Sequence, residues 1–200
     1  MMQDRTGMNR PAWKVVAGRT ARLFGIRFFD LYYGQRDLSA KAEPVVPSLA
    51  VEIRLAAKGD LQRIPRPVGI ERQMEFDRNR AFGSSCYIAV HEGKVAGYLW
   101  VNKKIINMEG MDLANLPAKH AFTHNAYVFR EYRNRKIYQF LRRAICHEMY
   151  QSGCRVISCL VDKANTRSIE ILRQEGIEFQ NAGVLKLPGF KPILFCRVIE

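Results

Sequence analysis

Cysteine is scarce in this sequence and is not arranged for cross-linking or metal binding. The five cysteines are scattered, no two of them form a CxxC pair, and no group of histidines accompanies them. Isolated cysteines of this kind are typical of buried, reduced thiols in a cytosolic protein. We therefore expect neither a disulfide framework nor a metal site.

Long apolar stretches are missing as well. No apolar run approaches the ~20 residues that a membrane span needs, and the first residues lack the uninterrupted apolar core of a signal peptide. These absences predict a cytoplasmic protein without a transmembrane segment. The sequence also lacks internal repeats, low-complexity segments, a paired-carboxylate arrangement and a Ser–His–Asp pattern, which argues against repeat architectures and against hydrolysis of those types.

Positive charge is what the sequence has in excess. The 200 residues carry a formal net charge of +13, while 48% hydrophobic and 26% charged residues are those of one globular domain. The charge favours a polyanionic partner: nucleic acid, an anionic membrane surface or a phosphorylated small molecule. Nucleic acid is the least favoured of the three, because the basic residues are spread along the chain without a recognised nucleic-acid motif.

Residues 1–48 differ from the rest and predict a basic N-terminal extension. A short amphipathic helix is expected to end near Gly25, and residues 28–33 (FFDLYY) predict an edge strand before a proline-containing linker. The helix packs on the domain's own core or on a partner subunit, as in a homodimer, or it lies on an anionic membrane surface. We expect residues 11–34 to mediate self-association or surface attachment. The apolar side of the helix comprises Trp13, Val16, Ala17, Thr20 and Phe24.

Residues 49–200 predict a mixed α/β domain in which helices pack on a sheet. Residues 51–55 alternate as a strand does, and residues 86–101 predict a hairpin with a glycine-containing turn. A charged helix is expected over residues 68–80 and an irregular segment over residues 105–119. Further strands are expected at residues 121–129, 155–161, 177–187 and 191–199, with helices from residue 137 to near Gly153 and, after the cap Asn165, over residues 166–175.

The stretch from Ala121 to Glu148 organises the rest of the chain. It predicts a half-buried strand, a basic turn from Arg130 to Lys136, and an amphipathic helix. The free backbone N–H groups and the positive dipole end of such a helix form an anion site, for which phosphate is the natural ligand. The alternative is a solvated basic helix start without a ligand.

This order of elements, with these loop residues, resembles the GCN5-related N-acetyltransferase family over about residues 50–200, and residues 1–48 lie outside the resemblance. In that family a valine ends the fourth strand, and a loop of the form Arg/Gln-x-x-Gly-x-Gly/Ala follows it. Val128 matches the valine, and residues 133–138 match the loop. A second family motif, Asn-x-x-Ala/Ser-x-x-x-Tyr followed by Gly-Phe, is matched in part by Asn165, Ser168 and Gly176.

The resemblance implies a mostly antiparallel central sheet with helices on both faces, and acetyl-CoA or another acyl-CoA as co-substrate without a metal. The backbone around Tyr127, Val128 and Phe129 would pair with the pantetheine arm. Asn165 would bond the cofactor, or it is a plain helix cap. The loop amides would hold the pyrophosphate, and they belong to Arg133, Asn134, Arg135, Lys136, Ile137 and Tyr138.

Three positions depart from the family pattern. Lys136 and Tyr138 stand where glycine and glycine or alanine are usual, and Leu172 replaces the tyrosine that often protonates the leaving thiolate. Glycine lets backbone approach phosphate closely, although the lysine ammonium is itself a good phosphate partner. Leucine cannot act as a general acid. An inactive binding module, for CoA or for a protein or polyanion partner, is therefore the alternative to an enzyme.

A base is needed to take the proton of an amine that attacks a thioester, and histidine suits this role near neutral pH. His124 is the best candidate, because it lies four residues before Val128 and is expected to share a face with Phe122 and Ala126. His120 is a weaker candidate and His147 a structural residue. The function expected from the resemblance is acyl transfer from acyl-CoA to a small-molecule or peptidyl amine by direct attack. Arg130 and Arg142 are expected to be solvated or to contact the 3′-phosphate of the cofactor.

Overall fold

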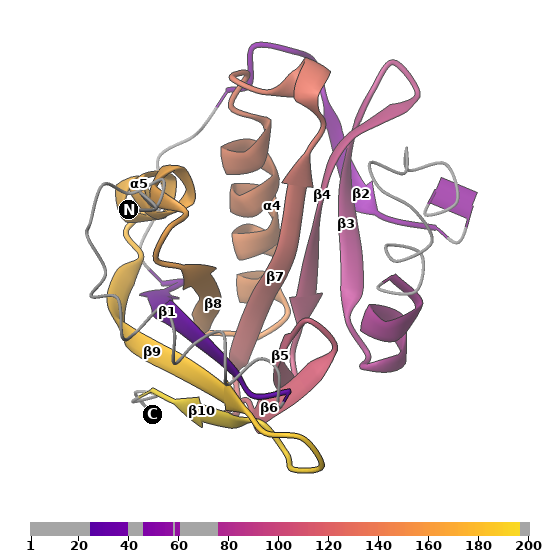
Figure 1. Ribbon diagram of the computed structural model, residues 1–200. Coiled ribbons are helices and arrows are strands. Elements are labelled where there is room, and N and C mark those ends of the chain that lie inside the picture. Colours follow the sequence, from indigo (N-terminus) through magenta and orange to yellow (C-terminus); the bar gives the residue numbers. More distant parts are fainter. Residues whose placement is uncertain (1–24, 40–45, 58, 61–75, 197–200) are drawn as a thin grey trace, which may run out of the picture.

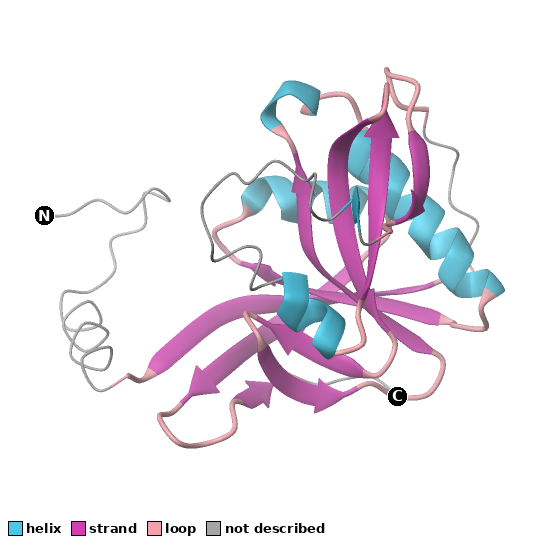
Figure 2. Cartoon of the chain, turned by 90° about the vertical axis from the view of Figure 1, so that its right-hand side faces the viewer, coloured by secondary structure: helices cyan, strands magenta, loops and turns pink. Residues whose placement is uncertain are grey.

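The computed structural model describes residues 25–39, 46–57, 59–60 and 76–196. Eight strands form one twisted sheet in the order β10-β9-β1-β8-β7-β4-β3-β2, and two more form the hairpin β5-β6 (Figures 1 and 2). The strands are β1 (Arg27–Asp37), β2 (Glu52–Leu55), β3 (Ser85–His91), β4 (Lys94–Asn102), β5 (Ile105–Met108), β6 (Met111–Asn115), β7 (His120–Val128), β8 (Val156–Asp162), β9 (Glu178–Lys186) and β10 (Ile193–Phe195). The helices with described bounds are the short 3₁₀ helix η1 (Arg130–Tyr132), α4 (Ile137–Gln151) and α5 (Thr166–Gln174).

The pairing of the strands confirms a mostly antiparallel mixed sheet. Neighbouring strands of the large sheet pair antiparallel except for β7 and β8, which run parallel. The parallel pairing joins only residues 120–123 to residues 156–159. Beyond these residues the two strands diverge, with α4 and α5 on the side where they part (Figure 1). The divergence opens the middle of the sheet at the end of β7.

Helices cover both faces of the sheet, as expected. On one face α4 buries Leu141, Ile145 and Met149 against residues of β3, β4 and β7. On the other face Phe76, which begins the described helical residues 76–81, packs on Tyr98 and Trp100 of β4. Alternate side chains of β4 point into the two cores, so both faces of this central strand are buried. Burial of apolar surface therefore stabilises the packing of both helical layers on the sheet.

The N-terminal strand β1 is not at an edge of the sheet, so that prediction is wrong. Residues 31–37 pair with β8 and residues 27–35 pair with β9, both antiparallel. Buried Leu31 and Tyr33 belong to the same core as Phe122 of β7. The expected division at residue 48 therefore separates this strand from its own neighbours in the sheet.

The segment expected to be irregular also differs. Residues 105–108 and 111–115 form the β5-β6 hairpin, whose tight turn contains Glu109 and Gly110, both at positive φ. The hairpin packs Ile106 against Leu31 and Phe122. The N-terminal amphipathic helix falls outside the described residues, as does the part of the expected helix at 68–80 that precedes residue 76. Within the described ranges, no helix combines the length and hydropathy needed to traverse a bilayer.

Candidate functional site

A cleft of about 560 Å³ opens where β7 and β8 part. Its walls come from the end of β7, the loop that follows it, the first turn of α4, and α5. Polar and apolar residues line it in similar measure, so it suits a ligand with both an anionic group and an apolar arm. The lining residues are Ala126, Tyr127, Val128, Tyr132, Arg133, Asn134, Lys136, Ile137, Tyr138, Gln139, Asn165, Arg167, Ser168 and Ile171.

A bulge in β7 shapes the strand wall of this cleft. The register with β4 shifts between Tyr98 and Trp100, and Asn125 has a positive φ of 48°. Ala126 is exposed to solvent. Because bulges commonly redirect strands beside functional sites, the shift explains why residues 126–128 face the cleft while residues 120–123 pair with β8.

The start of α4 offers backbone donors to the cleft. Lys136 is its N-cap residue, at φ 58°, and no side chain caps the helix. Phe140 is the residue whose N–H donates to the Lys136 carbonyl at 3.0 Å. The preceding amides of Ile137, Tyr138 and Gln139 are the donors that a helix leaves unsatisfied at its N-terminus. With no acidic residue in the first turn, this is the electrostatics of an anion site.

Arginine side chains add positive charge around these amides. The Arg133 Nε donates to the Val128 carbonyl at 3.1 Å, and its guanidinium lies 5.5 Å from the centre of the Tyr127 ring. Arg167 of α5 donates to the Asn134 side-chain oxygen and so joins the loop to α5 across the cleft. Arg133 thus hydrogen-bonds the Val128 carbonyl, a backbone group of β7 that an extended ligand would otherwise use.

Tyr138, in the first turn of α4, lines the cleft. Its ring packs against Cys159 of β8 and Leu172 of α5. Burial raises the pKa of the phenol to about 12, while the nearby Arg142 guanidinium acts in the opposite direction. The phenol is therefore a neutral hydroxyl at physiological pH, and its ring belongs to the same apolar cluster as Leu172.

Arg142 is not solvated, which corrects the expectation for this residue. Only 1% of its side chain is exposed, and its Nε lies 2.7 Å from Glu175 Oε2 at the end of α5. It also donates to Thr123 Oγ1 at 3.0 Å. The buried ion pair thus joins α4, α5 and the last residue of β7 that pairs with β8. Arg130, in contrast, is exposed.

His124 lies on β7 but is not part of the cleft lining. Its ring packs between Trp100 and Phe122, and its Nε2 lies 3.1 Å from Ser84 Oγ. Burial lowers its pKa from the ordinary 6.5 to about 4, because desolvation penalises the charged imidazolium. Phe122 shares its face, as predicted. The alternation stops at the bulge, so Tyr127, stacked on Tyr98, takes the place expected for Ala126.

The other predicted residues fall into two groups. Asn165 caps α5 by accepting the Ser168 N–H at 3.2 Å, as one of the two expectations had it, and it also lines the cleft. Its contact with a cofactor stays a prediction. Phe129 is buried beside β4, and its N–H donates to Ala96 at 3.0 Å. Arg135 is exposed outside the cleft lining. The remaining predicted cofactor-binding residues come together in the cleft: Tyr127, Val128, Arg133, Asn134, Lys136, Ile137 and Tyr138.

Sequence reasoning missed the contribution of α5 and of η1 to the cleft. Ser168 and Ile171 follow Asn165 at helical spacing, which is the signal that places them on one face of α5. Tyr132 was visible only as part of a basic turn. Its ring lines both the cleft and a second hollow of about 580 Å³ on the β2 side. The spacing of residues in the sequence could not have shown that Tyr132 lines two cavities.

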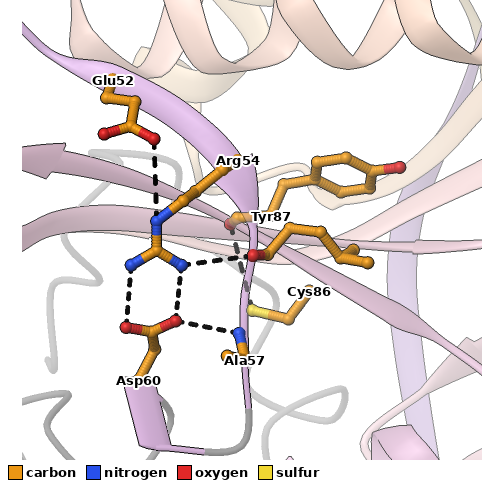
Figure 3. Close-up of polar contacts among 7 residues, drawn as sticks. Glu52, Arg54, Ala57, Asp60, Cys86 and Tyr87 are labelled. Carbon is orange, nitrogen blue, oxygen red and sulfur yellow. Dashed lines mark hydrogen bonds and ion pairs between the residues drawn. The ribbon is translucent and has the colours of Figure 1, made fainter.

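Glu52, Arg54 and Asp60 contribute polar side chains to the lining of the second hollow. The fork of Arg54 faces the Asp60 carboxylate with distances of 2.6 and 2.9 Å, and Asp60 also accepts the Ala57 N–H (Figure 3). Glu52 lies 3.8 Å from Arg54 Nε. These contacts join Arg54 of β2 to Asp60, and Asp60 to the Ala57 amide.

Comparison with known proteins agrees with this geometry. The sequence pattern of the acetyltransferase (GNAT) family matches residues 56–176. No curated protein matches the chain. Among solved structures, the fold is similar to a GCN5-related N-acetyltransferase from Sphaerobacter thermophilus, with 19% identity, coverage of 90% of this chain and 59% of that chain, and a TM-score of 0.54.

Two further solved structures are similar in fold. One is a tandem GNAT protein from the clavulanic acid biosynthesis pathway, with 15% identity and a TM-score of 0.57; the match covers 94% of this chain and 62% of that chain. The other is a GNAT-family protein from Novosphingobium aromaticivorans described as a putative acetyltransferase, with 16% identity and a TM-score of 0.51; the match covers 80% of this chain and 64% of that chain. The chain spans about three-fifths of the length of these proteins. The family match covers more than half of the sequence, and the chain belongs to the acetyltransferase (GNAT) family.

Proposed function

We propose that this protein is an acyl-CoA-dependent N-acyltransferase that acts on an amine. Members of the family are typically acyl-CoA-dependent N-acetyltransferases, which makes this activity the first to test. The observation that carries the proposal is the uncapped N-terminus of α4, which meets the diverging end of β7 in one cleft. An anion site beside a partly unpaired strand edge suits a ligand with a phosphate group and an extended amide arm.

The residues of the cleft divide the binding between them. The first amides of α4 and the ammonium of Lys136 would hold the pyrophosphate of the acyl-CoA, which supplies the activated thioester. Tyr127 and Val128 would guide the pantetheine arm, and Arg133 would release the Val128 carbonyl as the arm pairs with it. The arm would then run toward the side chain of Tyr138, which also lines the cleft.

The reaction itself needs two proton movements. As the acceptor nitrogen bonds to the thioester carbon and the carbon–sulfur bond breaks, the amine loses a proton and the sulfur gains one. His124 would accept the amine proton, since its low pKa keeps the imidazole neutral at neutral pH. Tyr138 would donate to the sulfur, because its phenol is protonated and lies beside Leu172, which cannot donate.

Calorimetry with acetyl-CoA and free CoA tests the binding part of this proposal. We expect binding in the micromolar range and weaker binding by Lys136→Ala, because Lys136 is the N-cap residue of α4 and lines the cleft. Lys103→Ala is the matched control: it removes the same charge from an exposed residue that does not line the cleft. The proposal fails at this step if wild-type protein binds neither ligand, or if both variants weaken binding equally through net charge.

Turnover separates the enzyme from an inactive binding module on the same fold. Tyr138 in a usual glycine or alanine position and Leu172 in place of tyrosine favour the inactive alternative. Release of free thiol from acetyl-CoA should be followed with a panel of small-molecule and peptidyl amines. Tyr138→Phe should lower kcat while leaving the KM for acetyl-CoA nearly unchanged. Binding without thiol release for any amine would support the inactive module.

A further inference from the structure

Two buried side chains, Asn102 and Ser84, form a hydrogen-bonded chain that ends at His124. Asn102, at the end of β4, is 1% exposed, and Ser84, just before β3, is 8% exposed. The Asn102 amide nitrogen lies 3.0 Å from Ser84 Oγ, and Ser84 Oγ lies 3.1 Å from His124 Nε2. The two short contacts place Ser84 between a fixed amide and the imidazole.

The orientation of the Asn102 amide follows from its backbone neighbours. Its side-chain oxygen receives the N–H groups of Lys104 at 2.7 Å and Ile105 at 3.0 Å. Backbone N–H groups only donate, so the atom they reach must be the oxygen and not the nitrogen. The nitrogen therefore faces the Phe82 carbonyl at 2.8 Å and Ser84 Oγ, and it donates one proton to each.

The direction of the next hydrogen bond follows from the first. Ser84 Oγ accepts from Asn102, and within the described part of the chain the partner that remains for its own proton is His124 Nε2. Because a nitrogen that accepts a hydrogen bond carries no proton, the neutral imidazole has its proton on Nδ1.

We propose that Ser84 is a positioning residue for His124: with Asn102 it holds the imidazole as the Nδ1-protonated tautomer and makes Nε2 the nitrogen that takes up a proton. The kinetic part of this inference rests on the proposed acyl transfer, whereas the tautomer does not. Among the described residues, the aromatic rings beside the imidazole are those of Trp100 of β4 and Phe122 of β7.

The arrangement fixes the nitrogen that takes up the amine proton in the proposed reaction. One N–H bond breaks at the attacking amine and one N–H bond forms at His124 Nε2, while Ser84 keeps its own proton. The positive charge of the resulting imidazolium is balanced by the negative charge that passes from the leaving sulfur to the Tyr138 phenolate.

NMR of the ¹⁵N-labelled imidazole tests the tautomer without any substrate. Wild-type His124 should show protonated Nδ1 and unprotonated Nε2, and Ser84→Ala should lose this preference. The pKa of His124 should rise in Ser84→Ala by about 0.5–1 pH unit, because a donor to the neutral ring is lost. Ser84→Thr, which keeps a hydroxyl, should resemble wild type. A wild-type ring protonated on Nε2, or a Ser84→Ala tautomer equal to wild type, would overturn the inference.

Kinetics then test the consequence for the reaction. Ser84→Ala should lower kcat about 10- to 100-fold with an unchanged KM for acetyl-CoA, and Ser84→Thr should recover most of it. Ser158→Ala is the control, since Ser158 is a buried serine that bonds the Ala121 carbonyl and not His124. If His124→Gln keeps full activity, the proposed base is wrong. An unchanged kcat in Ser84→Ala, with His124→Gln inactive, refutes the role of Ser84 alone.

Discussion

Lys136→Gly should make the protein more stable and its binding of CoA weaker. Lys136 has a φ of 58° at the N-cap of α4, and the left-handed region costs a residue with a Cβ about 1–2 kcal/mol. Glycine removes that cost but loses about 0.5–1 kcal/mol more conformational entropy on folding. The net gain should be about 0.5–1 kcal/mol, or a rise in Tm of about 1–4 °C for a chain of this length.

The binding change has a separate cause. Loss of the exposed ammonium should weaken CoA binding about fivefold, which corresponds to about 1 kcal/mol for one partly solvated ion pair. Lys136→Ala loses the same charge but keeps a Cβ, so it should bind like Lys136→Gly without its gain in stability. Lys136→Arg keeps both the charge and the Cβ and should resemble wild type in both measurements.

Thermal unfolding and calorimetry on the four proteins therefore give two independent orderings. The variant without a Cβ at residue 136 should be the most stable of the four proteins. The two proteins with a positive charge at residue 136 should bind CoA more tightly than the two without it. If Lys136→Gly is no more stable than Lys136→Ala, residue 136 carries no backbone strain, and the reasoning about this position is refuted.

Three further predictions concern the packing around the site. Gly34→Ala should lower the free energy of unfolding in chemical denaturation by about 1–3 kcal/mol, because a Cβ at residue 34 would lie 2.6 Å from Ile177 Cγ2. Gly59→Ala is the control and should not lower it, since a Cβ at residue 59 would meet open space. Arg142→Met should cost about 3–5 kcal/mol by removing the guanidinium that lies 2.7 Å from the buried Glu175 carboxylate, and the double variant Arg142→Met/Glu175→Met should recover much of that loss. A double variant as unstable as the single one would argue against the ion pair. The pKa of His124 is lower in the folded than in the unfolded chain, so the unfolded chain binds more protons between pH 6.5 and about 4. Stability therefore falls as the pH is lowered through this range, by about 2–3 kcal/mol from this group. Urea titrations from pH 7 to pH 4 should show His124→Gln losing less stability than wild type.

Local signals in the sequence predicted the strands and helices that make up the site. The hairpin at residues 86–101, the helix cap at Asn165 and the change from strand to helix around the basic turn all arise from neighbouring residues. Each was found at or near its expected place. The cleft followed from them, because a strand, a loop and a helix N-terminus in this order leave their free amides together.

What could not be predicted depends on partners far away in the chain. Arg142 has the same local sequence surroundings as a solvated arginine, and its burial is made tolerable by partners distant in the chain, Glu175 and Thr123. The bulge at Asn125 arises from an extra residue opposite β4, which no alternation pattern shows. The position of β1 likewise depends on pairing with residues 156–186 and not on its own composition.

The place of β1 has a consequence for the order in which this protein can fold. Leu31 pairs with Asp162 on one side and with Ala182 on the other, so the strand has no sheet neighbour until most of the chain has been synthesised. Contacts of such high sequence separation form slowly, since loop closure must precede them. The newly made strand, with its run of phenylalanine and tyrosine, would remain without pairing partners during translation, which is when exposed strands aggregate or exchange between copies. Closure of the sheet around β1 is thus the step that joins β8, the partner of β7 beside the cleft, to β9.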